Sequence, residues 1–390
     1  MTLPRILVVH NRYQALGGED AVVEDEVALL RARGHAVETY LRDNRELAHL
    51  GALDAFGQAL WARRTARELE ARFAAFRPDL VHVHNTFARV SGSAYWSAAR
   101  AGIPVVQTLH NFRLICVQAM FLREGRVCED CVGHAPWRGV LHKCYRNSRA
   151  QSAGLAAVVG LHRALGTYRD RVTRYVALTE FCRRKFIDGG LPAEKIMVKP
   201  NFVPDAPLPR APRRGGLFVG RLSPEKGIDA MLAALDAVPA AEIDVIGAGP
   251  EASKVAAHPR ARLLGWRPPR EVRARMARAA YLVMPSLWYE NFPRTLVEAF
   301  ASGLPVIASR LGALEELVDE DFTGLLFEPG SAQSLARRLD EAERRPEALR
   351  QMGRHARLVY ESAFTPDTNY EQLMAIYDSA LAEARPLEAA

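Results

Sequence analysis

The segment 220–227, which reads Gly-Arg-Leu-Ser-Pro-Glu-Lys-Gly, brings two cationic side chains to the end of a short apolar run typical of a buried strand. Ser223 is a good N-cap and Pro224 suits the first helical position, so the pattern predicts that a helix begins here. Backbone N–H groups at a helix start, with Arg221 and Lys226 beside them, would form a strong site for a diphosphate. The alternative is that both cations are ordinary solvated residues.

Two carboxylates follow in the segment 285–300. The apolar run 281–284 predicts a strand, and a helix is expected from about 293 to 302. Glu290 would then lie in the loop at the helix start, and Glu298 would lie inside the helix among apolar residues. An unpaired carboxylate is costly there, so Glu298 needs a partner, and a pair of sugar hydroxyls would serve. The alternative is that Glu298 points to solvent and Glu290 is an ordinary loop acid.

Four of the five cysteines lie in one polar segment with several glycines: Cys116, Cys128, Cys131 and Cys144. The central two form a C-x-x-C pair, and the others flank it at similar distances. Four thiolates at this spacing suit tetrahedral zinc in a small inserted loop, with His134 and His142 as substitute ligands. Reduced structural cysteines, or a redox pair, are the alternatives. Cys182 lies in a separate helical stretch.

The run 243–252 combines a strand with the pattern G-x-G-x-x-A, which resembles a dinucleotide fingerprint. A dehydrogenase would need an acidic residue at the end of the next strand, and the region 263–267 contains none. Pro250 also stands where the loop should bend toward a pyrophosphate. We therefore interpret this run as a tight strand-to-helix turn near the base of a bound nucleotide.

Short apolar runs that indicate strands alternate with longer amphipathic stretches that indicate helices, of which residues 19–33 are the first. The predicted strands are 6–9, 80–84, 105–109, 175–178, 217–219, 243–246, 262–264, 281–284 and 306–308. Alternation of this kind is typical of parallel sheets covered on both faces. The sequence therefore predicts an α/β fold of two doubly wound, Rossmann-like domains that face one another across a central cleft, with ligands at the carboxyl ends of the strands.

The proline-rich stretch from Pro200 to Gly216 marks the boundary between the domains. We assign residues 1–205 to the first domain, with a cysteine-rich insertion near 116–145, and residues 206–216 to the linker. Residues 217–365 form the second domain, and 366–390 form a last helix and a tail.

The chain of 390 residues is 49% hydrophobic and 25% charged, the balance of a globular enzyme rather than of a disordered chain. Its 52 Lys and Arg are dispersed among 45 Asp and Glu, which fits a phosphate-bearing partner without requiring nucleic acid. The amino terminus lacks a signal-peptide core, and no run of about 18 apolar residues could span a membrane. The odd cysteine count argues against a disulfide framework. A cytoplasmic protein is therefore expected.

The Gly-Arg-Leu-Ser-Pro-Glu-Lys-Gly segment, followed by Glu290 and Glu298 with seven residues between them, resembles the signatures of family 4 retaining glycosyltransferases, also called glycosyl transferases group 1. Further matching patterns are Pro78–Asn85, Thr108–Asn111, Lys199–Asn201 and Asn291–Pro293. Their order and spacing are specific, and the resemblance covers nearly the whole chain. It implies the GT-B fold.

The resemblance also implies a role for each matching residue. Arg221 and Lys226 would bind the donor diphosphate and stabilise the charge that develops as the nucleotide leaves. Glu298 would hold the donor ribose hydroxyls, Glu290 would contact the transferred sugar, and His110 would face that sugar as a positioning residue. The backbone at Asn291, Phe292, Thr295 and Leu296 would complete the phosphate cradle, and Gly17 and Gly18 would let backbone approach the donor.

The expected enzyme is a retaining glycosyltransferase that moves a sugar from a nucleotide diphosphate, UDP rather than GDP, to a hydroxyl of a glycan, lipid-linked or small-molecule acceptor. As in this family generally, the reaction would occur on one face of the sugar with the departing phosphate assisting deprotonation. No metal is expected in the chemistry, because Arg221 and Lys226 replace it. The first domain would bind the acceptor and the second the donor, with the last helix crossing back to the first domain and cleft closure about the linker completing the site.

Three alternatives stay open from the sequence. A sugar-phosphate phosphorylase could share the fold, and a non-catalytic protein could bind the nucleotide sugar without turnover. The stretch 62–77, with an apolar stripe and several arginines, could touch an anionic membrane that carries a lipid-linked acceptor, which would place the protein at the inner face of that membrane. We favour the core face of an ordinary surface helix, since Glu68 and Glu70 dilute the basic face.

Overall fold

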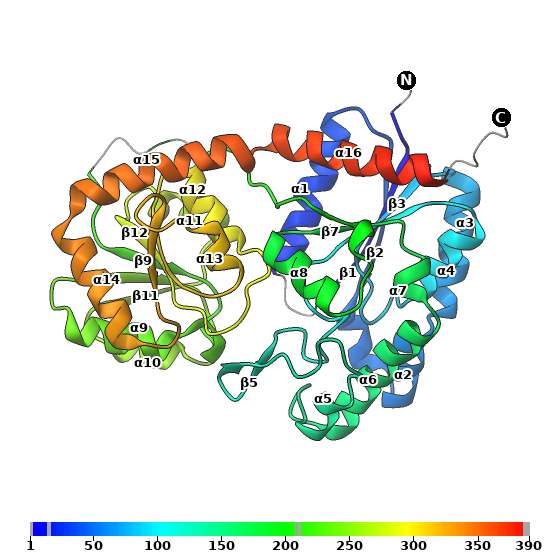
Figure 1. The fold of residues 1–390 in the computed structure, drawn as a ribbon, viewed down its shortest axis with the longest axis horizontal. Helices are drawn as coiled ribbons and strands as arrows, with labels where there is room; N and C mark the ends of the chain where they lie inside the picture. The colour runs from blue at the N-terminus through cyan, green and yellow to red at the C-terminus, as the bar shows by residue number, and fades with distance from the viewer. Residues whose placement is uncertain (1–2, 14–16, 207, 209–211, 385–390) are drawn as a thin grey trace. The chain divides into compact units, whose positions relative to one another are not determined.

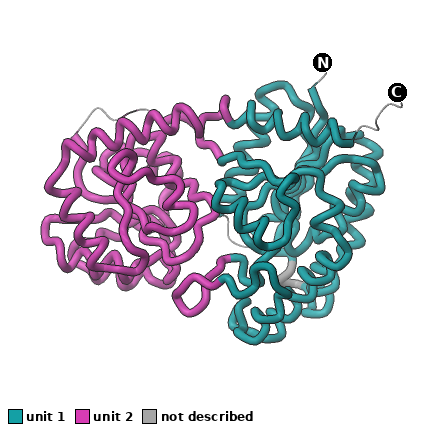
Figure 2. The backbone as a smooth tube through the Cα atoms, viewed as in Figure 1, with its two compact units in different colours: residues 1–119, 129–200, 369–390 teal, residues 120–128, 201–368 magenta. Residues whose placement is uncertain are grey.

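The computed structural model describes residues 3–13, 17–206, 208 and 212–384. The chain divides into two compact units (Figure 2). Unit 1 consists of residues 1–119, 129–200 and 369–390, and unit 2 consists of residues 120–128 and 201–368.

Unit 1 is built on a six-stranded sheet in the order β2-β1-β3-β4-β7-β8, in which all neighbouring strands are parallel (Figure 1). Its strands are β1 (Ile6–Arg12), β2 (Val37–Asp43), β3 (Leu80–Asn85), β4 (Val105–Thr108), β7 (Arg174–Ala177) and β8 (Ile196–Val198). Its helices are α1 (Gly18–Ala32), α2 (Ala52–Leu60), α3 (Arg63–Phe76), α4 (Ser93–Arg100), α5 (Arg138–Leu141), α6 (Arg149–Ala164), α7 (Thr167–Asp170), α8 (Glu180–Asp188) and most of α16 (Pro366–Ala384), with short 3-10 turns at Asn44–His49 and Ala193–Lys195. Because the strands are parallel, their carboxyl ends lie at one edge of the sheet.

The core of unit 1 follows from apolar residues at helical spacing. Val23, Val27 and Leu30 of α1 pack against the apolar side chains of β1, β3, β4 and β7. Leu373 and Ile376 of α16 belong to the same cluster, so this last helix is part of the unit 1 core.

Unit 2 repeats the architecture with the parallel order β11-β10-β9-β12-β13-β14. Its strands are β9 (Gly216–Val219), β10 (Ile243–Ile246), β11 (Ala261–Gly265), β12 (Tyr281–Met284), β13 (Val306–Ser309) and β14 (Gly324–Phe327). Its helices are α9 (Ile228–Ala237), α10 (Ala252–Ala257), α11 (Pro269–Met276), α12 (Arg294–Ala301), α13 (Ala313–Leu317), α14 (Ala332–Arg344) and α15 (Pro346–Ala363), with a 3-10 turn at Pro224–Lys226. Together with the matching sheet of unit 1, this confirms the predicted pair of Rossmann-like domains.

The predicted strands are all present, and three further strands, β2, β8 and β14, were not predicted. All three lie at sheet edges. β2 mixes polar and apolar residues, and β8 has only three residues, so neither produces a strong apolar run. A short antiparallel hairpin, β5 (Leu122–Arg123) with β6 (Arg126–Val127), lies within the predicted cysteine-rich insertion.

A helix begins at Pro224 after Ser223 as predicted, but it is a short 3-10 helix and not the start of the α-helix. Residues Pro224–Lys226 form a single 3-10 turn, Gly227 takes the left-handed conformation with φ 71°, and the α-helix begins only at Ile228. A side chain at Gly227 could not be accommodated, since a Cβ there would lie 1.8 Å from the carbonyl oxygen of Pro285. The close approach of two loops therefore replaces the first turn of the predicted helix.

Candidate functional site

The two cations of segment 220–227 lie at the carboxyl end of β9 in unit 2, but they differ in burial. The side chain of Arg221 is 62% exposed, and its guanidinium contacts Glu225 Oε1 at 2.6 Å. Lys226 is only 20% exposed, and its ammonium donates to Glu290 Oε1 at 2.6 Å. Both positive charges thus stand at the strand edge where α/β folds bind ligands, each held by one carboxylate.

Glu290 is buried in the loop after β12, and three donors converge on one of its oxygens. Besides Lys226, the Ser286 hydroxyl donates to Oε1 at 2.7 Å and the Trp288 indole N–H at 3.0 Å. The Lys226 ammonium also lies 5.4 Å from the centre of the Trp288 ring. The structure therefore brings Lys226 and Glu290 into one fixed ion pair, a contact that the sequence did not predict.

The residues predicted to complete a phosphate cradle lie around the start of α12. Phe292 packs its ring edge-to-face on Phe364 and Leu296 is fully buried, so only the backbone of these two residues could contact a ligand. The Leu296 N–H already donates to the Pro293 carbonyl at 3.0 Å. Thr295 is half-buried in the first turn, and Asn291 is buried just before the helix.

Glu298 has the partner that its position was expected to require, and this partner is a protein side chain. Arg294, one turn earlier, places its Nε 3.0 Å from Glu298 Oε1, and each side chain is 18% exposed. Residues four apart on a helix are neighbours, so the pairing follows from the spacing. The ribose-binding role of Glu298 stays a prediction.

The glycines of the G-x-G-x-x-A run serve backbone packing. A Cβ at Gly247 would lie 1.8 Å from the Gly220 carbonyl oxygen, and one at Gly249 would lie 2.3 Å from that of Leu222. Both glycines let the β10 loop press against the loop that carries Arg221. This contact explains the pattern without a dinucleotide.

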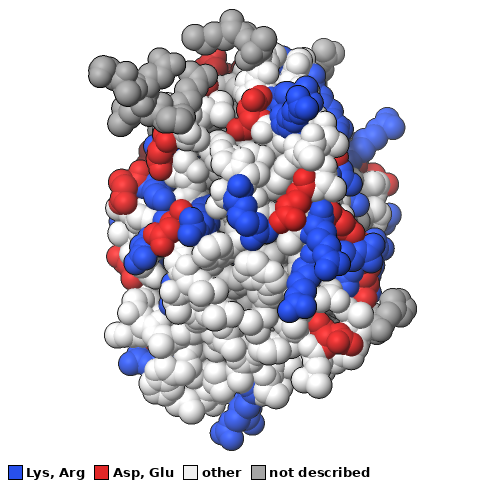
Figure 3. Space-filling view, turned by 90° about the vertical axis from the view of Figure 1, so that its right-hand side faces the viewer, with Lys and Arg blue, Asp and Glu red and all other residues white. Residues whose placement is uncertain are grey.

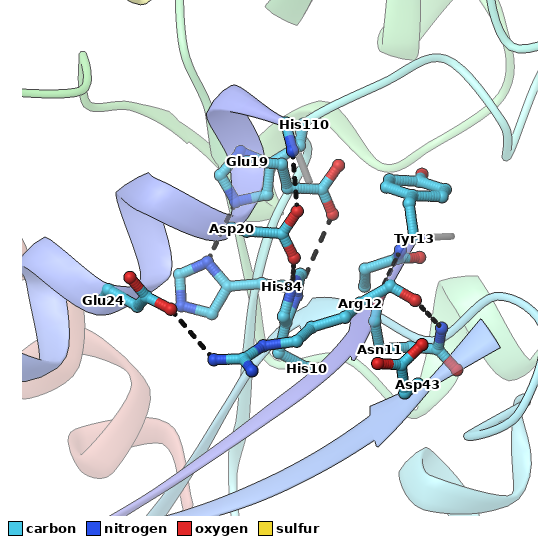
Figure 4. Close-up of polar contacts among 12 residues, drawn as sticks. His10, Asn11, Arg12, Tyr13, Glu19, Asp20, Glu24, Asp43, His84 and His110 are labelled. Carbon is cyan, nitrogen blue, oxygen red and sulfur yellow. Dashed lines mark hydrogen bonds and ion pairs between the residues drawn. The ribbon is translucent and has the colours of Figure 1, made fainter. Parts of the chain in front are cut away.

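At the carboxyl edge of unit 1, the loop after β1 leads into α1 at Gly17 and Gly18. A Cβ built at either glycine would meet no atom within 4 Å, which is compatible with a close backbone approach to a ligand. Asp20 accepts a hydrogen bond from the Gly17 N–H at 2.9 Å and lies 3.0 Å from His10 Nε2 (Figure 4). Burial alone would raise the pKa of Asp20, but these bonds outweigh it and lower that pKa.

Glu19, beside Asp20, was not singled out in the sequence. Its side chain is only 11% exposed, and its Oε1 lies 4.0 Å from His10 Nδ1 (Figure 4). That distance is too long for a hydrogen bond, and Oε1 has no hydrogen-bond donor among the described residues. Burial, reinforced by the charge of Asp20, raises the pKa of Glu19 to about 8 against the opposing hydrogen bond from Asn111. The carboxyl is therefore largely protonated at neutral pH.

His110 follows β4, and its Nε2 lies 2.9 Å from His84 Nδ1, with the two rings stacked. Burial and the neighbouring histidines lower the pKa of His110 well below its usual value, so the imidazole is neutral. Both rings line a cavity of about 50 Å³ within unit 1. Polar groups of Gln107, Arg113 and His162 line it as well, and the volume suits a few water molecules.

A buried charged cluster lies behind His84, and sequence reasoning missed it. Glu26 is 2% exposed and Lys199 is 1% exposed, and their Oε2 and Nζ atoms are 3.2 Å apart. Glu26 Oε1 lies 3.0 Å from His82 Nδ1 and 3.3 Å from His84 Nε2. The available signal was Glu26 itself, a carboxylate among the apolar positions Val23, Val27 and Leu30 of an amphipathic helix.

In the described part of the chain, no three of the four cysteine sulfurs of the predicted zinc site lie within 4.8 Å of one another. None of the five cysteines forms a disulfide. Within the described residues, the group of three or more potential ligands whose donor atoms lie within 4.8 Å of one another is Glu26, His82 and His84, and it includes no cysteine. The thiols as arranged do not fit tetrahedral zinc, and metal binding there stays a prediction.

The stripe on α3 lies in the core, since Ala66, Leu69 and Phe73 are buried. Its Arg64 pairs with Glu68 at 2.7 Å, and Arg72 pairs with Glu38. On the face shown in Figure 3, Lys and Arg lie beside Asp and Glu in the upper part, and the lower part carries few charged side chains. No helix in the described part of the chain has the length and hydropathy needed to cross a bilayer.

Comparison with known proteins identifies the family. Residues 212–359 match the family described as glycosyl transferases group 1, and residues 17–201 match the glycosyl transferase 4-like domain. The chain belongs to the group 1 glycosyl transferases. This confirms the resemblance seen in the sequence. The first region contains all strands of the unit 2 sheet, and the second contains the strands of the unit 1 sheet except β1.

Among curated relatives of this glycosyltransferase is the D-inositol 3-phosphate glycosyltransferase of Segniliparus rotundus. It is 29% identical over 329 residues, which are 79% of this chain and 67% of the relative. The protein of the same name from Corynebacterium glutamicum is 36% identical over 186 residues, covering 42% of this chain and 43% of its own.

Solved structures share the fold. Sucrose-phosphate synthase from Thermosynechococcus elongatus has a TM-score of 0.72 at 17% identity, with 97% of this chain and 100% of that chain covered. Anabaena HepE, solved with UDP and glucose, has a TM-score of 0.69 at 18% identity, with 96% and 100% covered. At such identities the likeness establishes the GT-B fold alone.

Proposed function

We propose that this glycosyltransferase moves a sugar from UDP to a hydroxyl of a sugar or polyol acceptor, with retention of anomeric configuration and without a catalytic metal. The observation that carries the proposal is the placement of Arg221 and Lys226 at the carboxyl end of β9, beside the start of α12. UDP as the nucleotide is supported by HepE, which was solved with UDP and glucose. A polyol acceptor is supported by the inositol 3-phosphate relatives.

In the proposed mechanism the two cations replace a divalent metal at the diphosphate. Arg221, which is largely exposed, binds the outer phosphate oxygens, and Lys226 stabilises the charge that develops as UDP departs. Glu290 keeps Lys226 in place before the donor arrives and then contacts the transferred sugar. Glu298 binds the ribose hydroxyls and shares its carboxylate with Arg294.

Retention by double displacement requires a carboxylate nucleophile close to the anomeric carbon. Both Glu290 and Glu298 are assigned to binding, and each already has a cationic partner. We therefore propose that the acceptor attacks the same face that UDP leaves, and that a departing phosphate oxygen takes the acceptor proton. The anomer of the product, read by NMR, tests retention, and an unchanged rate in EDTA tests the independence from metal.

A thermal melt with UDP, GDP and ADP tests the donor site first. A nucleotide at 100 times its dissociation constant should add about 2.7 kcal/mol of stability. We expect UDP to stabilise the protein, Arg221→Ala and Glu298→Ala to lose that effect, and Lys254→Ala, which removes an exposed lysine of the same unit, to keep it. Stabilisation by sugar phosphates but by none of the nucleotides would favour a phosphorylase. UDP binding without release of UDP from any donor and acceptor would indicate a binding protein.

A further inference from the structure

Two buried residues of unit 1, Glu26 and His84, lie in line with the half-buried His110. His84 Nδ1 lies at hydrogen-bond distance, 2.9 Å, from His110 Nε2. On its other side His84 Nε2 lies 3.3 Å from Glu26 Oε1, a charge contact, since neither of these two atoms has a hydrogen-bond partner among the described residues. His84 is 3% exposed. These contacts place His84 between a carboxylate on one side and the predicted sugar-facing histidine on the other.

The cluster already contains its own cation. Lys199 Nζ lies 3.2 Å from Glu26 Oε2 and also donates to Asn369 Oδ1 at 3.1 Å. Tyr377 Oη and Thr108 Oγ1 lie 2.7 Å and 2.8 Å from the two nitrogens of His82. One ammonium balances one carboxylate, so a divalent ion bound by Glu26, His82 and His84 would leave excess positive charge in a dry core. We therefore interpret the cluster as a hydrogen-bonding network.

The contacts of His84 determine which of its two nitrogens carries the proton. A neutral imidazole carries one N–H, and the nitrogen beside a carboxylate is the one that holds it. Burial, together with the neighbouring His82, lowers the pKa of His84 to about 3 although Glu26 opposes the shift, so His84 is neutral. Its proton then lies on Nε2, toward Glu26, and Nδ1 is left as an acceptor.

We propose that His84 is a positioning residue that fixes His110 as the Nε2–H tautomer, so that His110 offers Nδ1 to the transferred sugar as a hydrogen-bond acceptor. His110 must donate its Nε2 proton, because His84 Nδ1 has only a lone pair to offer. Its second nitrogen then accepts from a sugar hydroxyl rather than donating to a sugar oxygen. The part of this proposal that concerns the sugar rests on the proposed function, whereas the tautomer does not.

Long-range ¹H–¹⁵N spectra of protein labelled with ¹⁵N-histidine test the tautomer without any substrate. The chain has 11 histidines, and the signals of interest are assigned with His84→Asn and His110→Asn. We expect the Nε2–H form at both positions. An Nδ1–H form at His110 would overturn the proposal, and so would a stoichiometric metal whose removal shifts the His84 signals.

Two substitutions of His84 distinguish a role in positioning His110 from a role in packing the core. The amide of Asn occupies the place of Nδ1 and can still accept from His110, whereas the amide of Gln occupies the place of Nε2 and meets only Glu26. We expect His84→Gln to lower kcat/KM by about tenfold, through the loss of one buried hydrogen bond, and His84→Asn to recover most of that loss. Melting curves of both variants report any loss of packing.

Equal losses of kcat/KM in both variants, in step with equal losses of melting temperature, would overturn the positioning role and leave a structural one. If no nucleotide sugar is turned over by the unmodified protein, the proposed function fails, and the spectra still decide whether His84 fixes the tautomer of His110.

Discussion

The two units hold their charged groups in opposite ways. In unit 2, Arg221 is 62% exposed, and Lys226 is paired across one hydrogen bond at the edge of the sheet. In unit 1, Glu26 and Lys199 lie in the core, and the histidines between them and the edge are neutral. The positive charges of unit 2 are available to an anionic ligand. The charges of Glu26 and Lys199 in unit 1 are paired with each other, and they determine which nitrogens of the neighbouring histidines carry protons.

At neutral pH the largest effect is expected on the free energy of unfolding, when the buried ion pair of unit 1 is broken. Lys199→Ala leaves Glu26 as an unpaired buried charge, so we expect it to lower the free energy of unfolding by about 3–5 kcal/mol in urea titrations. Replacing both members, Glu26→Leu with Lys199→Leu, should restore most of that loss, since no charge is then left unpaired. Arg64→Ala, which breaks the exposed pair with Glu68, is the control and should change stability little. A double variant as unstable as Lys199→Ala alone would show that the pair itself stabilises the core.

The next largest effect is expected on kcat, when Lys226 of unit 2 is replaced. Lys226→Ala removes the cation that faces the departing diphosphate, and we expect kcat to fall by about 10²–10³-fold with a smaller change in melting temperature. The matched control is Lys254→Ala, a half-exposed lysine of the same unit that pairs with Asp229 and Glu251 and not with Glu290. A kcat for Lys226→Ala within a few-fold of the unmodified enzyme would remove this residue from the mechanism.

A pH-dependent effect is expected from Glu19 at the edge of unit 1. Its pKa is about 8 in the folded protein against about 4.5 for an ordinary glutamate, so the folded state binds the extra proton between these values. Stability should therefore fall as the pH rises through this window. Glu19→Gln cannot ionise, and we expect it to be more stable than the parent by about 5 kcal/mol at pH 9 and equal to it at pH 4.

Melts of the two proteins across this pH range measure the difference. Glu24→Gln is the control, because this neighbour on α1 is 64% exposed and pairs with Arg12 at the surface. Parallel pH profiles for Glu19→Gln and the parent would contradict a raised pKa.

The same contrast explains how much the sequence could predict. The site of unit 2 is assembled from two short segments, each with its chemistry within about ten residues, so Arg221, Lys226 and Glu290 were found. The cluster of unit 1 joins Glu26, His84 and Lys199 from different parts of the chain, and no local spacing reveals such a meeting. The helix start at Pro224 was predicted, but its restriction to one 3-10 turn was not, since the backbone of Pro285 occupies the space beside Gly227. Strands and domains were predictable because apolar periodicity is local.

The smallest effect on stability is expected for Gly17→Ala. The sequence alone does not distinguish this glycine from Gly227, whereas the structure does. Gly17 has φ −134° and nothing within 4 Å of a built Cβ, so Gly17→Ala should change stability by no more than about 1 kcal/mol. If backbone at this position approaches the donor, the added methyl group occupies that space, and we expect the KM for the donor sugar to rise several-fold. Steady-state kinetics with a varied donor concentration measure it.

Gly227→Ala is the matched comparison in unit 2. Gly227 has a φ of 71°, and a Cβ built on it would lie 1.8 Å from the carbonyl oxygen of Pro285, so there is no room for a methyl group. The loop must therefore move in this variant, and we expect the melting temperature to fall. Because that loop carries Lys226, kcat should fall along with stability. A Gly17→Ala variant that keeps both its melting temperature and its KM would show that the loop after β1 does not touch the donor, and the assignment of this edge to donor binding would then rest on His110 alone.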